Sequence, residues 1–277
     1  MEAHVQGKGG AKDCIVFLGG WPDDYTIWDF QVSHFSASHR CIAIQIPGLG
    51  VANNDPSRAW GWEVEELLQQ LKEVILLHSE GNPVTLVTHD WGAVLGYEFI
   101  ALNQSLVKCL IALDVGMGIS FWNIPGLCCL FTYQFWLLIS FLLGSNPVTN
   151  AITALVARVL GWPFSKERRR ALNSSMNYLY FTYWKMIFKR GFGGQNPRSR
   201  MLFLHGSKGY KKWVQFFNKQ WLDGVKSKMG STELELPHCG HWMMVEDPDL
   251  LNELMTYFLD KKLSLVKQKA REMSHQG

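Results

Sequence analysis

The cysteines of this chain do not form a metal-binding pattern. The six cysteines, at positions 14, 41, 109, 128, 129 and 239, lack the spacings that hold metal ions. Cys14, Cys41 and Cys109 lie in apolar runs, where cysteine usually acts as a small buried hydrophobic residue. The sequence therefore predicts no metal centre.

Two further patterns are missing, and each absence excludes a class of protein. The net charge is only +3, and no stripe of Arg and Lys alternates with aromatic residues, so nucleic acid is not an expected partner. Residues 1–12 are polar and Gly-rich, unlike a secretory signal peptide. We expect a cytoplasmic protein with reduced cysteines.

The centre of the chain lacks charge of either sign. No Asp, Glu, Lys or Arg lies between Asp114 and Arg158, and residues 127–143 are almost wholly apolar or aromatic. A full membrane span needs about 20 apolar residues. Three polar residues interrupt the run and a proline precedes it: Thr132, Gln134, Ser140 and Pro125. The pattern predicts either a helical cap over a core or a lid with peripheral membrane contact, rather than a span.

Outside this stretch, apolar runs alternate with amphipathic segments. Strands are expected at residues 14–18, 41–46, 84–88, 107–113, 201–204 and 232–236. Helices are expected at residues 63–78, 91–102, 211–222 and 248–265. Strands that alternate with helices indicate a mostly parallel, twisted sheet flanked by helices. The fold class is therefore α/β with an inserted helical cap.

These patterns divide the chain into four parts. Residues 1–116 are the first part of the core, 117–198 the apolar cap and 199–265 the second part of the core. Residues 266–277 are a basic tail, and the polar stretch from Lys261 onward is expected to fray. The pattern makes no prediction of the oligomeric state.

The segment from Val84 to Ala93 predicts a strand, a sharp turn and a helix, with Asp90 at the tip of the turn. Such a turn is the nucleophile elbow of hydrolases, in which small neighbouring residues let strand and helix approach. A carboxylate at the tip would form an alkyl ester rather than an acyl-enzyme. The alternative is that Asp90 only caps the helix.

A carboxylate nucleophile needs a separate base that activates water on the ester. Two histidines, His238 and His241, lie between the strand that ends at Leu236 and the helix expected from Pro248. His241 follows Gly240, which allows a tight turn. We favour His241 as the base.

Three motifs resemble the epoxide hydrolase and haloalkane or fluoroacetate dehalogenase branch of the α/β-hydrolase family. They are His89-Asp90-Trp91-Gly92, Gly240-His241-Trp242 and Gly19-Gly20-Trp21-Pro22. The resemblance as a whole covers residues 14–265. The resemblance implies that the backbone N–H groups of Trp21 and Trp91 hold the ester carbonyl and the later oxyanion. It implies no cofactor. Gly19 replaces the histidine usual at the start of the third motif.

The acid partner of the base is missing from its commoner place. Many relatives carry it after the strand that ends here at Leu204-His205-Gly206, but no Asp or Glu occurs between Glu167 and Asp223. Some relatives carry it after the strand that follows the elbow helix, where this chain has Asp114. We favour Asp114 over the alternative that it is only a turn residue.

The cap aromatics bear on the leaving group. The resemblance implies that two cap tyrosines donate protons to an epoxide oxygen, and Tyr133 and Tyr180 are the expected pair. Tyr178 and Tyr183 are further candidates for the pocket, although Tyr178 and Tyr180 point apart on a helix. A halide would instead need N–H donors such as Trp91 with Trp136 or Trp184.

The expected function is hydrolysis of a small apolar epoxide or related alkyl electrophile. Asp90 attacks carbon, and His241, oriented by Asp114, activates water. One alternative is a carbon–halogen hydrolase with the same triad. The other is a catalytically degenerate hydrolase that serves as a binding or membrane-associated protein, which Gly19 and the displaced acid favour.

Overall fold

The structure is a computed structural model of the whole chain. It describes residues 1–277 except 8–9, 51–57, 119–122, 166–167, 169–170, 191–196, 213 and 275–277.

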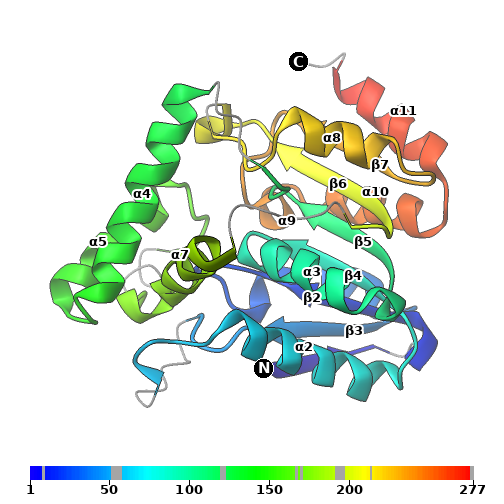
Figure 1. Cartoon of the computed structure of the whole chain (residues 1–277). Coiled ribbons are helices and arrows are strands. Elements are labelled where there is room, and N and C mark those ends of the chain that lie inside the picture. The colour runs from blue at the N-terminus through cyan, green and yellow to red at the C-terminus, as the bar shows by residue number, and fades with distance from the viewer. Residues whose placement is uncertain are drawn as a thin grey trace.

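A seven-stranded sheet forms the centre of the molecule, in the order β1-β3-β2-β4-β5-β6-β7 (Figure 1). The strands are β1 (Glu2–Gln6), β2 (Cys14–Leu18), β3 (Arg40–Gln45), β4 (Val84–His89), β5 (Val107–Leu113), β6 (Arg200–Gly206) and β7 (Thr232–Leu236). Only β1 pairs antiparallel, with β3. The predicted mostly parallel α/β fold is confirmed.

Helices cover both faces of the sheet, and this explains why β2 and β4 are buried along their whole length and why β2 is wholly apolar. In Figure 1, α2 and α3 lie in front of the strands and α10 lies behind them. The core helices are α1 (Asp29–Phe35), α2 (Val64–Ser79), α3 (Trp91–Leu102), α8 (Lys219–Lys226), α9 (Met243–Glu246), α10 (Pro248–Leu259) and α11 (Leu263–Ser274). Short 3-10 helices are η1 (Ala11–Asp13), η2 (Tyr25–Trp28), η4 (Gln104–Leu106), η5 (Ser174–Asn177) and η6 (Gly209–Lys212).

In its described residues the inserted segment contains the helices α4 (Ile124–Leu142), α5 (Pro147–Val159) and α7 (Tyr178–Arg190). Figure 1 shows α4 and α5 side by side at one end of the molecule, with α7 between them and the core. Asn177 joins cap and core: its side chain accepts from the Trp21 indole and donates to the Leu137 carbonyl and to Thr153 Oγ1.

The structure corrects three local predictions. The helix expected at residues 211–222 begins only at Lys219, because Asn218 caps it there. The helix expected at residues 248–265 breaks after Leu259, and Lys261 has a φ of 62°. The expected frayed tail instead forms α11, with Val266 buried. Strand β1 lies in the polar N-terminal stretch, where no strand was predicted.

Candidate active site

Asp90 occupies a strained turn between β4 and α3. Its φ of 52° and ψ of −126° lie where residues with a side chain rarely occur. Such strain costs about 1–3 kcal/mol and persists where the surrounding structure enforces it. The Asp90 side chain makes no N-capping hydrogen bond, and its contact with α3 is to the N–H of the first residue, Trp91, so helix capping does not account for this aspartate.

Two glycines allow the close approach around this turn. A Cβ on Gly20 would lie 2.4 Å from Asp90 Oδ1, and a Cβ on Gly92 would lie 2.2 Å from the Leu18 carbonyl oxygen. Both distances are far below van der Waals contact. Glycine at these positions therefore lets the loop after β2 and the start of α3 close around the carboxylate.

Backbone donors face one oxygen of Asp90. The Trp21 N–H donates to Asp90 Oδ1 over 2.7 Å, and the Trp91 N–H also hydrogen bonds to this carboxylate. The Trp21 indole donates to Asn177 Oδ1 over 2.8 Å, which holds the loop in place. Preorganised N–H groups of this kind stabilise a developing oxyanion.

His241, in the loop after β7, faces the other oxygen. Its Nε2 lies 3.3 Å from Asp90 Oδ2, and its Nδ1 donates to Asp114 Oδ2. The neighbouring His89 donates through Nε2 to the His241 carbonyl over 3.0 Å, which steadies the loop. The structure thus brings Asp90, His241 and Asp114 together, although they come from three separate chain segments.

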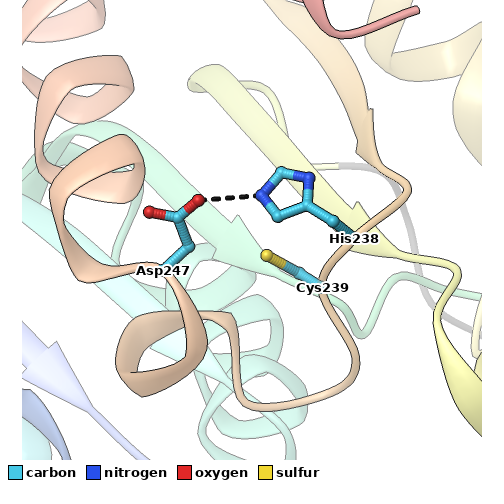
Figure 2. A group of neighbouring side chains, drawn as sticks. All are labelled: His238, Cys239 and Asp247. Atoms are coloured by element: carbon cyan, nitrogen blue, oxygen red, sulfur yellow. Dashed lines mark hydrogen bonds and ion pairs between the residues drawn. The ribbon is translucent and has the colours of Figure 1, made fainter. Parts of the chain in front are cut away.

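His238, the second candidate base, is engaged elsewhere. Its Nε2 lies 2.8 Å from Asp247 Oδ2, and Figure 2 shows the two side chains facing each other beside Cys239. These three residues place potential metal-ligand atoms within 4.8 Å of one another. Burial raises the pKa of the Cys239 thiol to about 12, however, which disfavours the thiolate that a metal needs.

Asp114 is a fully buried carboxylate at the end of β5. Its Oδ1 accepts from the Gly206 N–H over 3.1 Å, and its Oδ2 lies 2.9 Å from Lys211 Nζ as well as receiving the His241 N–H. Lys211 was not among the residues predicted from the sequence. The sequence feature that could have pointed to it is a lysine in the loop after β6, the position at which many relatives carry the acid.

The interactions among these charged side chains determine the protonation of Asp90, His241 and Asp114. Burial lowers the pKa of His241, but the carboxylates of Asp114 and Asp90 outweigh burial and raise that pKa to about 9. Burial raises the pKa of Asp114, yet Lys211 and His241 hold it well below its usual range. With both carboxylates ionised, the imidazole of His241 is protonated at neutral pH.

A second buried acid lies near the base loop. Asp23 accepts from the indoles of Trp162 and Trp242 over 2.8 and 3.0 Å, and burial raises its pKa to about 7. Burial lowers the pKa of His89 to about 3, so His89 is a neutral donor. Neither residue was identified from the sequence.

A cavity of about 370 Å³ opens above Asp90, between α3 and the cap helices. A volume of this size is typical of small-molecule sites. Its lining is mainly apolar and aromatic and includes Trp91, Leu130, Phe131, Tyr133, Tyr180, Tyr183, Ile187 and Phe216. Besides Asp90, it includes one carboxylate, Glu98.

Tyr133 and Tyr180 approach Asp90 from the cap. Their rings lie edge to face, with centroids 6.3 Å apart, and the Tyr180 ring lies edge-on to Trp91 at 4.9 Å. Burial raises the pKa of both hydroxyls, so both remain protonated and able to donate. Tyr183 also lines the cavity and packs edge-on to Trp91 at 5.0 Å.

Two predicted pocket residues lie outside this cavity. Tyr178 is buried, and its hydroxyl donates to the Pro47 carbonyl over 2.7 Å, because it points away from Tyr180 on α7. Trp136 is 47% exposed on α4 and does not line the cavity. Trp184 does line it, but its indole donates to Gln134 over 3.1 Å.

The family model described as "Alpha/beta hydrolase family" matches residues 15–254. The chain belongs to this family. An epoxide hydrolase 2 from Caenorhabditis elegans is 23% identical over 285 residues, which cover 94% of this chain and 78% of that protein. The family resemblance inferred from the motifs is therefore confirmed.

Solved structures share the fold. An epoxide hydrolase from Bacillus megaterium, in complex with its naphthyloxy-propanediol product, matches with a TM-score of 0.68 and 20% identity, over 94% of this chain and 96% of that one. A haloalkane dehalogenase from Bradyrhizobium elkanii matches with a TM-score of 0.65 and 14% identity, over 96% and 95%.

The charge coupling predicts how His241 titrates. In the free protein its pKa should lie near 9, and Asp90→Ala should lower it because one of the two neighbouring anions is removed. NMR titration of ¹⁵N-labelled histidine, assigned with His241→Gln, measures this pKa. His238→Gln is the control and should leave the His241 titration unchanged. An unshifted pKa in Asp90→Ala would contradict the coupling.

Proposed function

We propose that this protein hydrolyses apolar epoxides through an ester of Asp90. The observation that carries the proposal is one arrangement: a carboxylate between backbone donors and His241, beneath a cavity into which two tyrosines project. Relatives named epoxide hydrolases support the choice of substrate class. The mainly apolar lining matches an apolar substrate.

Each oxygen of Asp90 has a distinct role in the first step. Oδ1 is held by the Trp21 N–H, so Oδ2 attacks the epoxide carbon. As the C–O bond to the ring oxygen breaks, the alkoxide takes a proton from Tyr133 or Tyr180. An alkoxide is a poor leaving group, and general-acid assistance of this kind contributes about 10²–10⁴-fold.

Loss of the Asp90 charge prepares the second step. The carboxylate of Asp90 raises the pKa of His241, so forming the neutral ester lowers that pKa and lets the imidazole release its proton. His241 then takes a proton from water, and the hydroxide adds to the ester carbonyl carbon. The backbone N–H groups hold the oxyanion, and its collapse breaks the ester C–O bond. The departing alkoxide takes the proton from His241 to complete the diol, and Asp90, released as the acid, returns its proton to His241. The tyrosine that donated in the first step regains its proton from the imidazolium when the ester lowers the His241 pKa.

The donors in the cavity favour an epoxide over a halide. A halide needs N–H groups, but the Trp91 side chain hydrogen bonds to Tyr180, the Trp184 indole donates to Gln134 and Trp136 lies outside the cavity. Two protonated tyrosines suit an epoxide oxygen better.

We also propose that the cap contacts anionic membrane surfaces. Helix α4 is 19 residues long with a mean hydropathy of 1.6, and only 28% of its most apolar window is buried. Its outward stripe is apolar, as is that of α5: Ile124, Phe131, Phe135, Leu142, Val148, Leu155 and Val159 are exposed. Unlike a single exposed apolar residue, such stripes are typical of interaction surfaces.

The charge of the cap helices indicates which kind of membrane surface the cap would contact. The sequences of α4, α5 and α7 contain four basic residues and no acidic residue, and one of the four, Lys185, is paired with Glu63. Basic residues beside an apolar helix favour anionic lipids. Phe131 belongs both to the exposed stripe and to the cavity lining, so apolar substrates in a bilayer would enter near it.

Asp114→Asn should slow ester hydrolysis while leaving attack by Asp90 largely intact, because the imidazolium loses its stabiliser. After incubation with styrene oxide, intact-protein mass should increase by one substrate, and peptide mapping should place the adduct on Asp90. The Asp247→Asn variant is the control and should not accumulate this adduct. Near-normal turnover by Asp114→Asn would refute this role.

Tyr133→Phe should slow epoxide turnover by about tenfold or more, because the leaving oxygen loses a proton donor. Tyr178→Phe is the matched control, since that hydroxyl binds Pro47 outside the cavity, and its turnover should stay close to wild type. Diol formation is measured by chromatography. Halide release from 1-chlorobutane, with styrene oxide left intact, would replace this proposal with a dehalogenase.

The protein should float with phosphatidylserine-containing vesicles in a density gradient. Replacing exposed Phe135 and Trp136 by Ser should reduce the bound fraction by about tenfold or more, because burial of each large apolar side chain contributes about 1.5–3 kcal/mol. A control with Leu77→Ser and Met229→Ser, also exposed but outside the cap, should bind as wild type. Equal binding by all three proteins would exclude the cap surface.

A further inference from the structure

Lys211 is a fully buried lysine whose ammonium contacts the acid of the candidate triad. Its side chain is 0% exposed, and Nζ lies 2.9 Å from Asp114 Oδ2. The same oxygen receives the N–H of His241. One carboxylate oxygen therefore serves two nitrogen donors.

The surroundings of Lys211 tie it to this carboxylate. Its Nζ lies 4.1 Å from the centre of the Phe216 ring, a cation–π contact, and among the described residues Asp114 is its only charged partner within ion-pair distance. A buried cation without compensation would cost several kcal/mol. The ion pair with Asp114 thus holds both side chains in place.

We propose that Lys211 is a positioning residue for His241: by sharing Asp114 with the imidazole, it balances the acid and makes esterification of Asp90 the event that frees the base. This inference rests on the function proposed above. Without Lys211, the charge of Asp114 would act on His241 undiminished. The imidazole would then keep its proton even after Asp90 had become a neutral ester.

Several charged or titratable groups of the described residues lie near His241, and Glu246 of α9 is one of them, because it accepts from the N–H groups of Gly240 and Trp242. Asp90 and His89 approach from the elbow, Asp23 from the loop after β2, Asp114 from the end of β5 and Lys211 from η6. Tyr133 and Tyr180 of the cap lie near Asp90 and are neutral. Tyr210, beside Lys211, is neutral as well, because burial raises its pKa. Lys211 is the one cation in this group besides the imidazole itself.

Lys211→Met tests the proposal, because methionine fills similar space without charge. The pKa of His241 in the free protein, measured by NMR, should rise by about one unit or more. The pH profile of ester hydrolysis in single turnover should move to higher pH in the same direction. Lys212→Met, at an exposed neighbour in the same loop, should change neither.

If Lys211 were merely structural, Lys211→Met would lower stability but leave the His241 titration of the folded protein unchanged. That result would overturn the proposal. If Lys211→Met does not fold, Lys211→Gln removes the charge and keeps a polar side chain beside Asp114. Its His241 pKa must then exceed that of the wild-type protein, and an equal or lower value overturns the proposal.

The titration separates this inference from the proposed function. It needs no substrate, so a shifted His241 pKa in a protein that forms no ester would leave the electrostatic role standing and refute only the reaction. If the ester forms but neither pKa nor pH profile moves in Lys211→Met, the role of Lys211 alone is refuted.

Discussion

Compensation of buried charge at the ends of β4 and β5 is the constraint on which the candidate site depends. Asp90 and Asp114 are carboxylates largely withdrawn from water, His241 bridges them and Lys211 contacts the second. An unpaired ion in this place would cost several kcal/mol, whereas together these groups keep one another ionised. Any reaction in the cavity above Asp90 depends on the charges of these four residues.

The apolar helix α4 of the cap presents two different faces. Side chains that face the core, such as Tyr133 and Tyr180, form the roof of the cavity over Asp90. Side chains such as Phe135 on the opposite face of α4 remain exposed. Helical periodicity separates the two faces. The absence of charge between Asp114 and Arg158 is therefore compatible with a packed roof and a lipid-facing surface in the same helix.

Local patterns predicted most of the core, because buried parallel strands are continuous apolar runs and the elbow joins one such run to a helix. They failed where local preference is weak. Strand β1 is a short, polar edge strand stabilised by pairing with β3. Helix α11 is basic and was predicted to be a frayed tail, but its buried Val266 packs it against the core.

The sequence by itself determined the elbow at Asp90, its backbone donors and a histidine after the last strand, because each is encoded by neighbouring residues. The family resemblance and a strand-end position already favoured Asp114 as the partner of His241, and the tertiary structure brings the two side chains together. Tertiary structure alone decided that His238 turns to Asp247 and that Tyr178, rather than Tyr180, is the tyrosine that points away from the cavity. It also placed Lys211 beside Asp114. These contacts join residues far apart in the chain, so strand order and side-chain packing determine them, and no local pattern carries that information.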